Sequence, residues 1–354
     1  MEEMKLNETP VRTSRNFNIN NIKLENINIP AKSDVFENVQ IIKESSKVDI
    51  SENASKAQLA YGLNKELIEN VNENSNKNIR IMINSKTENT SKLYFKFDKS
   101  NQNLIENVEI VAMENTKATV ILKYESEENE KFYHNGIIRV NAERGSNVNV
   151  IIVNLINTVS NNFLAIENVL ENDSKLKYTI IDFGGKSSIT NYYSNLLGSN
   201  SDNTLNTIYL GKENQLFDLN YIGELRGEKS NIDIEVQGAL KDTAIKHFKG
   251  TIDFKKGCKK ATGNENENCM LLSDKAKSVA LPMLLCSEED VEGNHSTSSG
   301  KIGEKELFYI MSRGFSLKEA QKLMVRAKFN KILENVKDEE LKQEIFDEID
   351  NRLD

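Results

Sequence analysis

The chain has 354 residues, a net charge of −8, 38% hydrophobic residues and no tryptophan. This length supplies one large elongated domain or two compact ones. A negative charge, without a basic stripe interleaved with aromatic residues, argues against nucleic-acid binding. No run approaches the ~20 apolar residues that a membrane helix needs, so we expect no membrane partner.

The three cysteines, Cys258, Cys269 and Cys286, show no CxxC or similar ligand spacing. An odd number of cysteines and a polar stretch over residues 1–24 predict a cytoplasmic protein with reduced thiols. Cysteine is among the most buried residue types, so we expect all three thiols to pack in the core.

The chain begins with an extended segment over residues 1–35, followed by a short helical pattern over residues 57–70. From residue 79 onward, short runs rich in β-branched residues recur, and several of them alternate apolar with polar positions. A period of two indicates strands. The predicted strands are 79–83, 92–97, 108–113, 118–124, 137–140, 148–155, 176–183, 205–210, 216–222, 232–236 and 248–254.

The strands are joined by connections rich in Asn, Gly, Ser and Lys, with no long helical pattern between them. This argues against a doubly wound α/β fold, which needs crossover helices. Two architectures remain: a sandwich or barrel built of hairpins, and a parallel β-helix. Two-residue Asn-Gly turns are scarce, with Asn135-Gly136 the only one, which favours the β-helix slightly.

The last part of the chain combines a strand, a loop and helices. Residues 280–286 predict a short strand buried on both faces, and residues 287–300 predict a surface loop. Ser316 and Glu319 form a capping box that opens a helix. Helices are expected over 302–311, 317–335 and 338–353, and the second has Ala320, Leu323, Met324 and Ala327 on one apolar face.

The same region resembles the C-terminal signature of the SufB/SufD family of iron–sulfur cluster assembly proteins, and is most similar to the SufD branch. The matching positions are Asp290, Val291, His295, Gly300, Phe308, Tyr309, Ser312, Arg313 and Gly314. No general fold rule demands a histidine, a Ser-Arg-Gly turn and a capping box at these offsets. The signature is therefore specific, although the resemblance is strong only over about the last third of the chain.

The resemblance implies a mainly β protein with a right-handed parallel β-helix core. It places an N-terminal mixed and helical region at residues 1–78, the β-helix at 79–290 and a C-terminal helical domain at 291–354. The C-terminal helices are expected to cover an end of the coil stack, where strand edges would otherwise be unpaired.

By the same resemblance, the chain is a non-enzymatic scaffold subunit of the SUF machinery that pairs with a SufB-like subunit and docks the SufC ATPase. The sequence has no Walker A phosphate loop, so the ATPase must be another chain. The resemblance also suggests the helical hairpin as the SufC dock. Its candidate contact residues are Phe308, Tyr309, Arg313, Met324 and Arg326.

His295 is the main candidate site residue, because a neutral imidazole can ligate iron or a nascent cluster. The family places a histidine here at the SufB–SufD interface. We expect no tightly bound cofactor, and only a transient iron–sulfur cluster. His134 and His247 flank aromatic-containing strands and are expected to have packing or surface roles.

The chain departs from the family pattern at several positions. Many SufD proteins carry cysteine where this chain has Gly293, and SufB proteins carry glutamate where it has Ser296. The positions that match the SufB cysteines are Ala276 and Glu267. Persulfide chemistry needs a thiolate, so this chain is not expected to accept sulfur by itself.

Two other functions stay open. One is a SufB-like or homodimeric scaffold that acts without a separate SufB. The more remote one is a β-helix carbohydrate-active enzyme, which would need convergent carboxylates on one sheet face, and the sequence shows no clear cluster of that kind.

Overall fold

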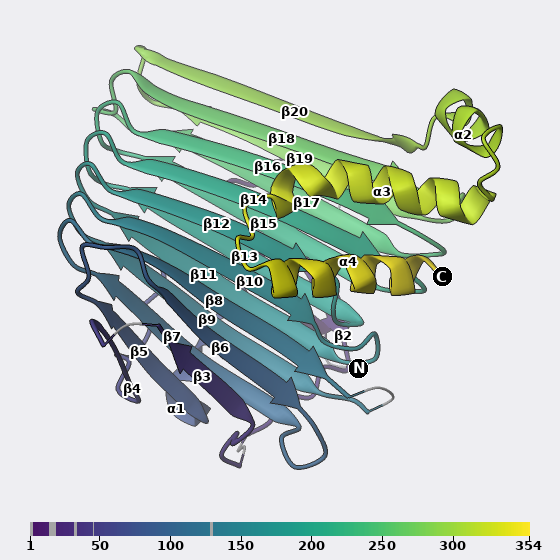
Figure 1. The fold of residues 1–354 in the computed structure, drawn as a ribbon. Helices are drawn as coiled ribbons and strands as arrows, with labels where there is room; N and C mark the ends of the chain where they lie inside the picture. Colours follow the sequence, from purple (N-terminus) through teal and green to yellow (C-terminus); the bar gives the residue numbers. More distant parts are fainter. Residues whose placement is uncertain (1–2, 14–18, 32–33, 45, 128–129) are drawn as a thin grey trace.

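The structure, a computed structural model, describes residues 3–13, 19–31, 34–44, 46–127 and 130–354. Two nine-stranded sheets face each other across one core (Figure 1). The odd sheet consists of β4 (Val48–Ser51), β5 (Lys77–Ile83), β7 (Asn103–Ala112), β9 (Tyr133–Ala142), β11 (Asn161–Leu170), β13 (Ser187–Leu196), β15 (Leu216–Leu225), β17 (Ile245–Phe254) and β19 (Lys277–Cys286). The even sheet consists of β3 (Val39–Lys43), β6 (Thr90–Phe97), β8 (Lys117–Ser126), β10 (Asn147–Leu155), β12 (Lys175–Asp182), β14 (Asp202–Gly211), β16 (Asn231–Leu240), β18 (Ala261–Leu271) and β20 (Val291–Lys301).

From β5 to β20 the chain alternates between the two sheets, and each strand pairs in parallel with the strand two places along. Asn147, for example, pairs with Lys117, thirty positions earlier, and with Lys175, twenty-eight positions later. Each turn of the coil therefore adds one strand to each sheet. The predicted parallel β-helix is confirmed, and the hairpin sandwich is wrong for this span.

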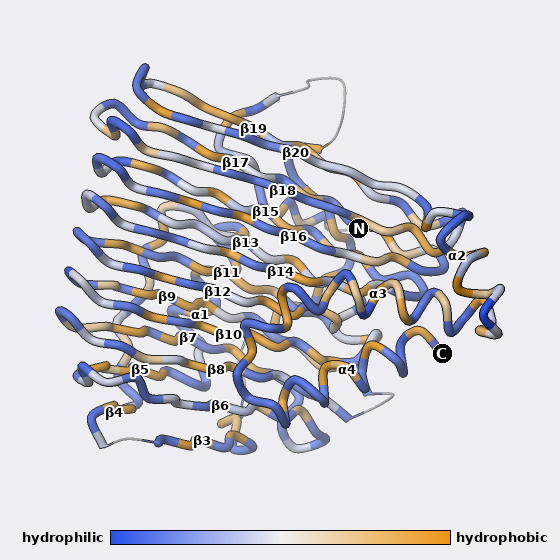
Figure 2. The backbone as a smooth tube through the Cα atoms, turned by 45° about the horizontal axis from the view of Figure 1, so that its top comes forward, coloured by the Kyte–Doolittle hydropathy of each residue, from blue (hydrophilic) through white to orange (hydrophobic). Residues whose placement is uncertain are grey.

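The core lies inside the coil, where inward side chains of both sheets meet. Figure 2 shows hydrophilic and hydrophobic positions alternating along many strands, as the period of two requires. Aromatic rings in the core pack edge-to-face with centroids 5.2, 5.9 and 5.8 Å apart: Tyr178 with Tyr192, Tyr192 with Tyr221, and Tyr221 with Phe248.

Within the coil from β5 to β20, four strands were not predicted: β11, β13, β18 and β20, and the short strands β1 to β4 before the coil were not predicted either. β13, β18 and β20 carry many Asn, Ser, Thr and Glu residues and lack the apolar runs that reveal a strand, whereas β11 has such a run at Phe163–Ile166 that was overlooked. The predicted surface loop over 287–300 is wrong, because Val291–Lys301 forms β20 and pairs with β18 along its length. The adjoining β19 is half-buried rather than buried on both faces.

The N-terminal region covers one end and one face of the coil. Short strands β3 and β4 pair antiparallel with β6 and β5, which ends the parallel stack. The hairpin of β1 (Glu3–Leu6) and β2 (Ile22–Glu25) packs with α1 (Lys65–Asn74) on the outer face of the odd sheet. The helix begins later than predicted, because the Asn64 side chain caps it by accepting from the backbone N–H of Leu67 at 2.8 Å.

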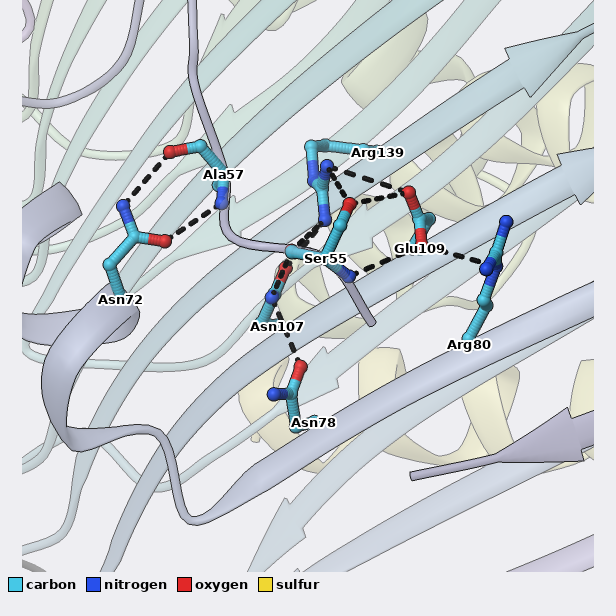
Figure 3. Close-up of polar contacts among 8 residues, drawn as sticks. All are labelled: Ser55, Ala57, Asn72, Asn78, Arg80, Asn107, Glu109 and Arg139. Atoms are coloured by element: carbon cyan, nitrogen blue, oxygen red, sulfur yellow. Dashed lines mark hydrogen bonds and ion pairs between the residues drawn. The ribbon is translucent and has the colours of Figure 1, made fainter. Parts of the chain in front are cut away.

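Polar contacts fix the segment before α1 on the odd sheet (Figure 3). The Ser55 hydroxyl donates to Glu109 at 2.8 Å, and Arg139 donates to the Ser55 carbonyl at 2.5 Å. The Asn72 side chain accepts from the Ala57 N–H at 2.7 Å and donates to the Ala57 carbonyl at 2.9 Å. These contacts satisfy backbone groups of an irregular segment that would otherwise need water.

The C-terminal helices are α2 (Glu304–Met311), α3 (Leu317–Leu333) and α4 (Glu339–Leu353). The predicted capping box is present: the Ser316 side chain accepts from the Glu319 N–H, and the Glu319 carboxylate accepts from the Ser316 N–H. The predicted apolar face of α3 is only partly right. Ala320 is buried, but Leu323 is exposed, and the other buried positions are Val325, Phe329, Ile332 and Leu333.

α3 and α4 lie on the outer face of the even sheet, in front of its central strands (Figure 1). Phe329 of α3 stacks on Phe183 with ring centroids 6.3 Å apart, and Arg352 of α4 donates to the Phe183 carbonyl. The expectation that these helices cover an end of the coil stack is therefore wrong. The outward apolar positions of the even strands need a cover, and the helices provide it.

Candidate functional site at the open end of the β-helix

The two ends of the coil differ in the strands that form them: one end is closed by short strands, and the other ends in long strands. At the N-terminal end, β3 and β4 close the sheets with strands of five and four residues. At the other end, β19 and β20 are the outermost strands, with ten and eleven residues. We call the coil of β19 and β20 the open end, because no further strand pairs with either edge in the described part of the chain. Long, uncovered edges present unpaired backbone N–H and C=O groups.

His295 lies in the middle of β20, not in a loop, and is exposed. Val291 of the same strand packs on the core inside the coil, so the period of two places His295 on the inward side as well. In the parallel register, His295 lies beside Glu265 of β18. The imidazole is thus the inward residue of the last rung, next to the coil interior but open to solvent.

Beneath the last rung, the coil interior holds a charged cluster. The Lys246 ammonium donates to Glu267 at 2.8 Å and to the Val279 carbonyl at 3.3 Å, and both charged side chains are buried. Glu265 is also buried, and no hydrogen-bond partner is found for either carboxylate oxygen among the described residues. Burial and the Glu267 carboxylate raise the pKa of Glu265 to about 8.

Tyr209 of β14 completes this cluster from two rungs below. Its hydroxyl donates to Glu267 at 2.9 Å, so its ring must pass the intervening strand β16. That strand has Gly238 in register with Tyr209, and a Cβ atom there would lie 1.8 Å from the ring carbon Cζ. The glycine makes the contact possible, because any side chain would occupy the space of the ring.

Sequence reasoning missed Lys246, Glu265 and Tyr209 as site residues, and considered Glu267 only as the position of a family cysteine. Strand β18 contains Glu alternating with Asn over residues 264–268, and this period of two was the available signal. It went unrecognised because inward positions of a strand are normally apolar, and here they are carboxylates.

The other histidines have the expected packing roles. His134 is fully buried, and its ring nitrogens face Asn162 at 2.6 Å and Glu106 at 3.2 Å. The Tyr124 hydroxyl donates to the same Glu106 carboxylate at 2.5 Å. His247 is partly exposed, with Nδ1 3.6 Å from a carboxylate oxygen of Asp218.

The three cysteines are free thiols. Cys258 and Cys269 are buried as expected, and burial raises the pKa of the Cys258 thiol to about 11. The expectation for Cys286 is wrong, because this residue ends the edge strand β19 and is exposed. Its thiol donates to the Glu288 carbonyl at 2.9 Å.

A second candidate surface lies on α2 and the start of α3. Several large apolar side chains are exposed there: Phe308, Tyr309, Met311, Phe315, Leu317 and Leu323, with Phe308 the most exposed at 75%. The Arg313 guanidinium stacks on the Tyr309 ring, 4.7 Å from its centroid. Met324 is half-buried and lines a shallow hollow together with Tyr309 and Ile310.

The last of the predicted dock residues has partners within the C-terminal helices. Arg326 donates to Asp350 at 2.9 Å and stacks on Phe346 at 4.7 Å from the ring centroid. These contacts hold α3 against α4. Phe308 and Tyr309, by contrast, are exposed and free to touch a partner.

Within the part of the chain that the structure describes, no group of three or more His, Cys, Asp or Glu residues is arranged to hold a metal ion. No described helix has both the length and the apolar character needed to cross a membrane.

The family assignment comes from residues 95–328, which match the domain described as "SUF system FeS cluster assembly, SufBD core domain". The match includes most of the β-helix, the open end with His295, and α2 with most of α3. The chain belongs to the SufBD family. This is the family that the C-terminal signature predicted.

Individual relatives agree with this assignment. The chain is 26% identical over 181 residues to the iron-sulfur cluster assembly protein SufD of Bacillus subtilis, covering 51% of this chain and 41% of that protein. It is 24% identical over 241 residues to SufD of Escherichia coli, covering 68% and 57%. An iron-sulfur cluster assembly SufBD family protein of Pyrococcus horikoshii is 32% identical over 161 residues, covering 45% and 35%. The chain thus spans about half of the length of these relatives.

Proposed function

We propose that this SufBD-family chain is a non-enzymatic scaffold subunit that pairs with a SufB-like subunit through its open end and docks a SufC-type ATPase on α2 and α3. The observation that carries the proposal is the uncovered last coil. Its two strands offer ten- and eleven-residue edges, whereas the opposite end of the coil carries the short antiparallel strands β3 and β4. A partner that ends in the same kind of coil would continue both sheets by strand addition.

The residues at the open end favour an end that is covered by a partner over one that stays exposed to solvent. β19 carries the half-buried apolar residues Ala280 and Leu284, which pack on the core from its margin. Pro282 is compatible with this position, because proline within a sheet is confined to edge strands or bulges. A second coil placed on the open end would bury these apolar side chains, which favours association.

The pairing test uses co-purification with the SufB-like subunit of the same organism. Thr297→Lys places a long cation at the exposed edge of β20 and is expected to abolish co-purification, because edge lysines oppose strand addition. Thr243→Lys, at an exposed turn before β17, is the matched control and should pair normally. Pairing that survives Thr297→Lys contradicts the assignment. A chain that forms a stable homodimer through this edge, and does not bind the SufB-like subunit, would support the homodimeric alternative instead.

The proposed dock for the ATPase rests on the exposed aromatic surface of α2. Phe308 and Tyr309 are large, exposed and followed by Arg313, and such residues are typical anchors at protein interfaces. Phe308→Ala should reduce SufC binding at least tenfold without changing stability, because the side chain has few contacts to lose. Leu197→Ala, which truncates an exposed apolar side chain at a coil corner, is the control. Equal SufC affinity for both variants would refute the dock.

Point variants are preferable to removal of the helices. A chain ending at Gly300 would lose Phe329 and the other α3 and α4 residues that bury the outer face of the even sheet. The exposed sheet face would then associate non-specifically, and lost SufC binding would no longer report on the dock.

His295 is proposed to contact the iron or the growing cluster between the subunits. His295→Ala should lower iron and sulfide content in the co-expressed complex while leaving folding and subunit pairing intact, because the side chain is exposed. Ser296→Ala, on the outward side of the same strand, is the control. An unchanged cluster yield for His295→Ala would contradict this role.

A further inference from the structure

A groove of about 400 Å³ lies on the outer face of the even sheet, between strands β6 to β12 and the linker that joins α3 to α4. Outward side chains of four neighbouring strands form its floor, in two rows that follow the parallel register. The first row is polar and consists of Thr90, Thr119, Asn149 and Lys177. The second row consists of Lys92, Ile121 and Ile151. The remaining lining residues are Asn335, Lys337 and Asp338 of the linker, with Glu44 and Glu88.

The end of the groove at β12 carries positive charge that no side chain balances. The Lys177 ammonium donates to Asn335 Oδ1 at 2.7 Å. No carboxylate of the described residues lies within 4.0 Å of the ammonium of Lys177 or Lys337. Burial and the neighbouring Lys337 charge lower the pKa of Lys177. Lys92, by contrast, is paired with Asp338 at 2.6 Å. An anion bound at β12 would relieve the repulsion between the two unpaired ammonium groups.

The opposite end of the groove, at β6 and β8, carries unbalanced negative charge. Glu44 accepts from the Thr90 backbone N–H at 3.1 Å, and Glu88 accepts from the Thr119 hydroxyl at 3.5 Å. Among the described residues, no Lys, Arg or His nitrogen lies within 4.0 Å of either carboxylate. Between the two ends, the Asn149 side-chain oxygen is buried and has no hydrogen-bond partner in the described part of the chain. The polar row therefore offers carboxylates, a free acceptor and ammonium groups in that order.

The spacing of the strands sets the length of a ligand that meets both ends. Three strand spacings of about 4.8 Å separate β6 from β12, which gives about 14 Å. A free amino acid carries both charges within one residue and is too short. An extended peptide advances about 3.3 Å per residue, so about five residues place one charged side chain at each end. A backbone N–H of such a peptide would supply the donor that Asn149 lacks, and its apolar side chains would contact Ile121 and Ile151.

We propose that this groove binds an extended peptide segment with an acidic side chain at one end and a basic side chain about four residues away. The acidic side chain meets Lys177 and Lys337, and the basic side chain meets Glu44 and Glu88. Charge complementarity at both ends favours this dipolar peptide over a purely acidic or a purely basic one. The inference goes beyond the proposed function, because the groove contains no residue of the open end or of α2.

The test is isothermal titration calorimetry of the purified full-length chain with two peptides, acetyl-Lys-Val-Ser-Val-Glu-amide and acetyl-Glu-Val-Ser-Val-Lys-amide. Blocked termini leave one charge at each end of the peptide, and the two orders cover both directions in the groove. At least one peptide should bind. Replacing its Glu by Gln should weaken binding about tenfold, because the ammonium groups then lose their partner.

Variants of the groove identify the charge that pairs with the peptide. Lys177→Met keeps the aliphatic stem in the floor and should weaken binding about tenfold. It should also no longer distinguish the Glu peptide from its Gln analogue, as a double-mutant cycle requires of a direct pair. Lys337→Met changes an exposed side chain, should act in the same direction, and replaces Lys177→Met if that variant has a lower melting temperature. Lys175→Met removes an exposed cation of β12 outside the groove and is the matched control.

Three results would overturn the inference. Neither peptide may bind at about 1 mM, or both groove variants may bind the Glu peptide and its Gln analogue as the wild type does. Alternatively, Lys175→Met may weaken binding as much as Lys177→Met, which would indicate attraction to general surface charge. Lys177→Met should still co-purify with the SufB-like subunit and with SufC. A failure of the peptide test therefore leaves the proposed function untouched.

Discussion

The buried pair of Lys246 and Glu267 permits a demanding test of how the coil interior is stabilised. Their charged atoms lie 2.8 Å apart, and the side chains are 0% and 1% exposed. Lys246→Met keeps most of the side-chain volume but leaves Glu267 without its cation and next to Glu265. Removing one partner of a buried ion pair destabilises a protein by about 3–5 kcal/mol. We therefore expect the free energy of unfolding of Lys246→Met to be lower than that of the wild type by the same amount.

The double variant Lys246→Met with Glu267→Gln separates the charge from the packing. It removes both charges and leaves an amide that can still accept from the Tyr209 hydroxyl. We expect it to recover most of the loss, because desolvation of the two charges offsets much of their attraction. The three variants and the wild type form a double-mutant cycle.

Urea unfolding followed by far-ultraviolet circular dichroism measures the four free energies of unfolding, since the chain has no tryptophan for fluorescence. A loss below about 1 kcal/mol for Lys246→Met would refute the reasoning. So would a double variant whose loss equals the sum of the two single losses, because independent sites show that result.

Three further predictions concern other parts of the fold. Burial raises the pKa of Asp182 to about 6, so the folded state binds its proton more tightly than the unfolded state, and stability falls as pH rises from about 4 to 6. The free energy of unfolding of Asp182→Asn should therefore rise by up to about 3 kcal/mol relative to that of the wild type between pH 4 and pH 7. Urea unfolding at each pH measures both free energies. The same pH dependence in the two proteins would contradict this prediction. Phe329→Ala removes a fully buried ring that stacks on Phe183. The free energy of unfolding, measured by thermal or urea unfolding, should fall by about 3–5 kcal/mol. A fall of less than about 1 kcal/mol would contradict this expectation. Ser316→Ala deletes the cap of α3 and should cost about 1 kcal/mol, whereas Ser316→Asp, which restores a capping oxygen, should recover it.

The local patterns of the chain were strong enough to reveal most of its elements. Alternating residues such as Ile232, Ile234 and Val236 marked strands, and the Ser316 capping box marked the start of α3 within one residue. The parallel coil was not decided by these patterns alone, because alternation is the same in a hairpin and in a coil. The family signature made that choice, and the register of β5 to β20 confirms it.

Strands without apolar runs escaped prediction, and β18 and β20 are the instructive cases. In β18 the inward positions include Glu265 and Glu267, and in β20 they include His295. A propensity argument treats such segments as loops, because it does not include the backbone pairing that neighbouring rungs supply. Once β16 is in place, β18 adds to its edge, and β20 adds to β18 in turn.

By itself, the sequence determined the type of most elements, the caps of the helices and the family signature, since all of these depend on residues close together in the chain. Only the tertiary structure decided which surface the helices cover and which end of the coil stays open. It also decided that His295 lies one rung above Glu265, whose carboxylate has no hydrogen-bond partner among the described residues. These features depend on pairs of residues about thirty positions apart, and their contacts arise from the turn length of the coil, which no local pattern specifies.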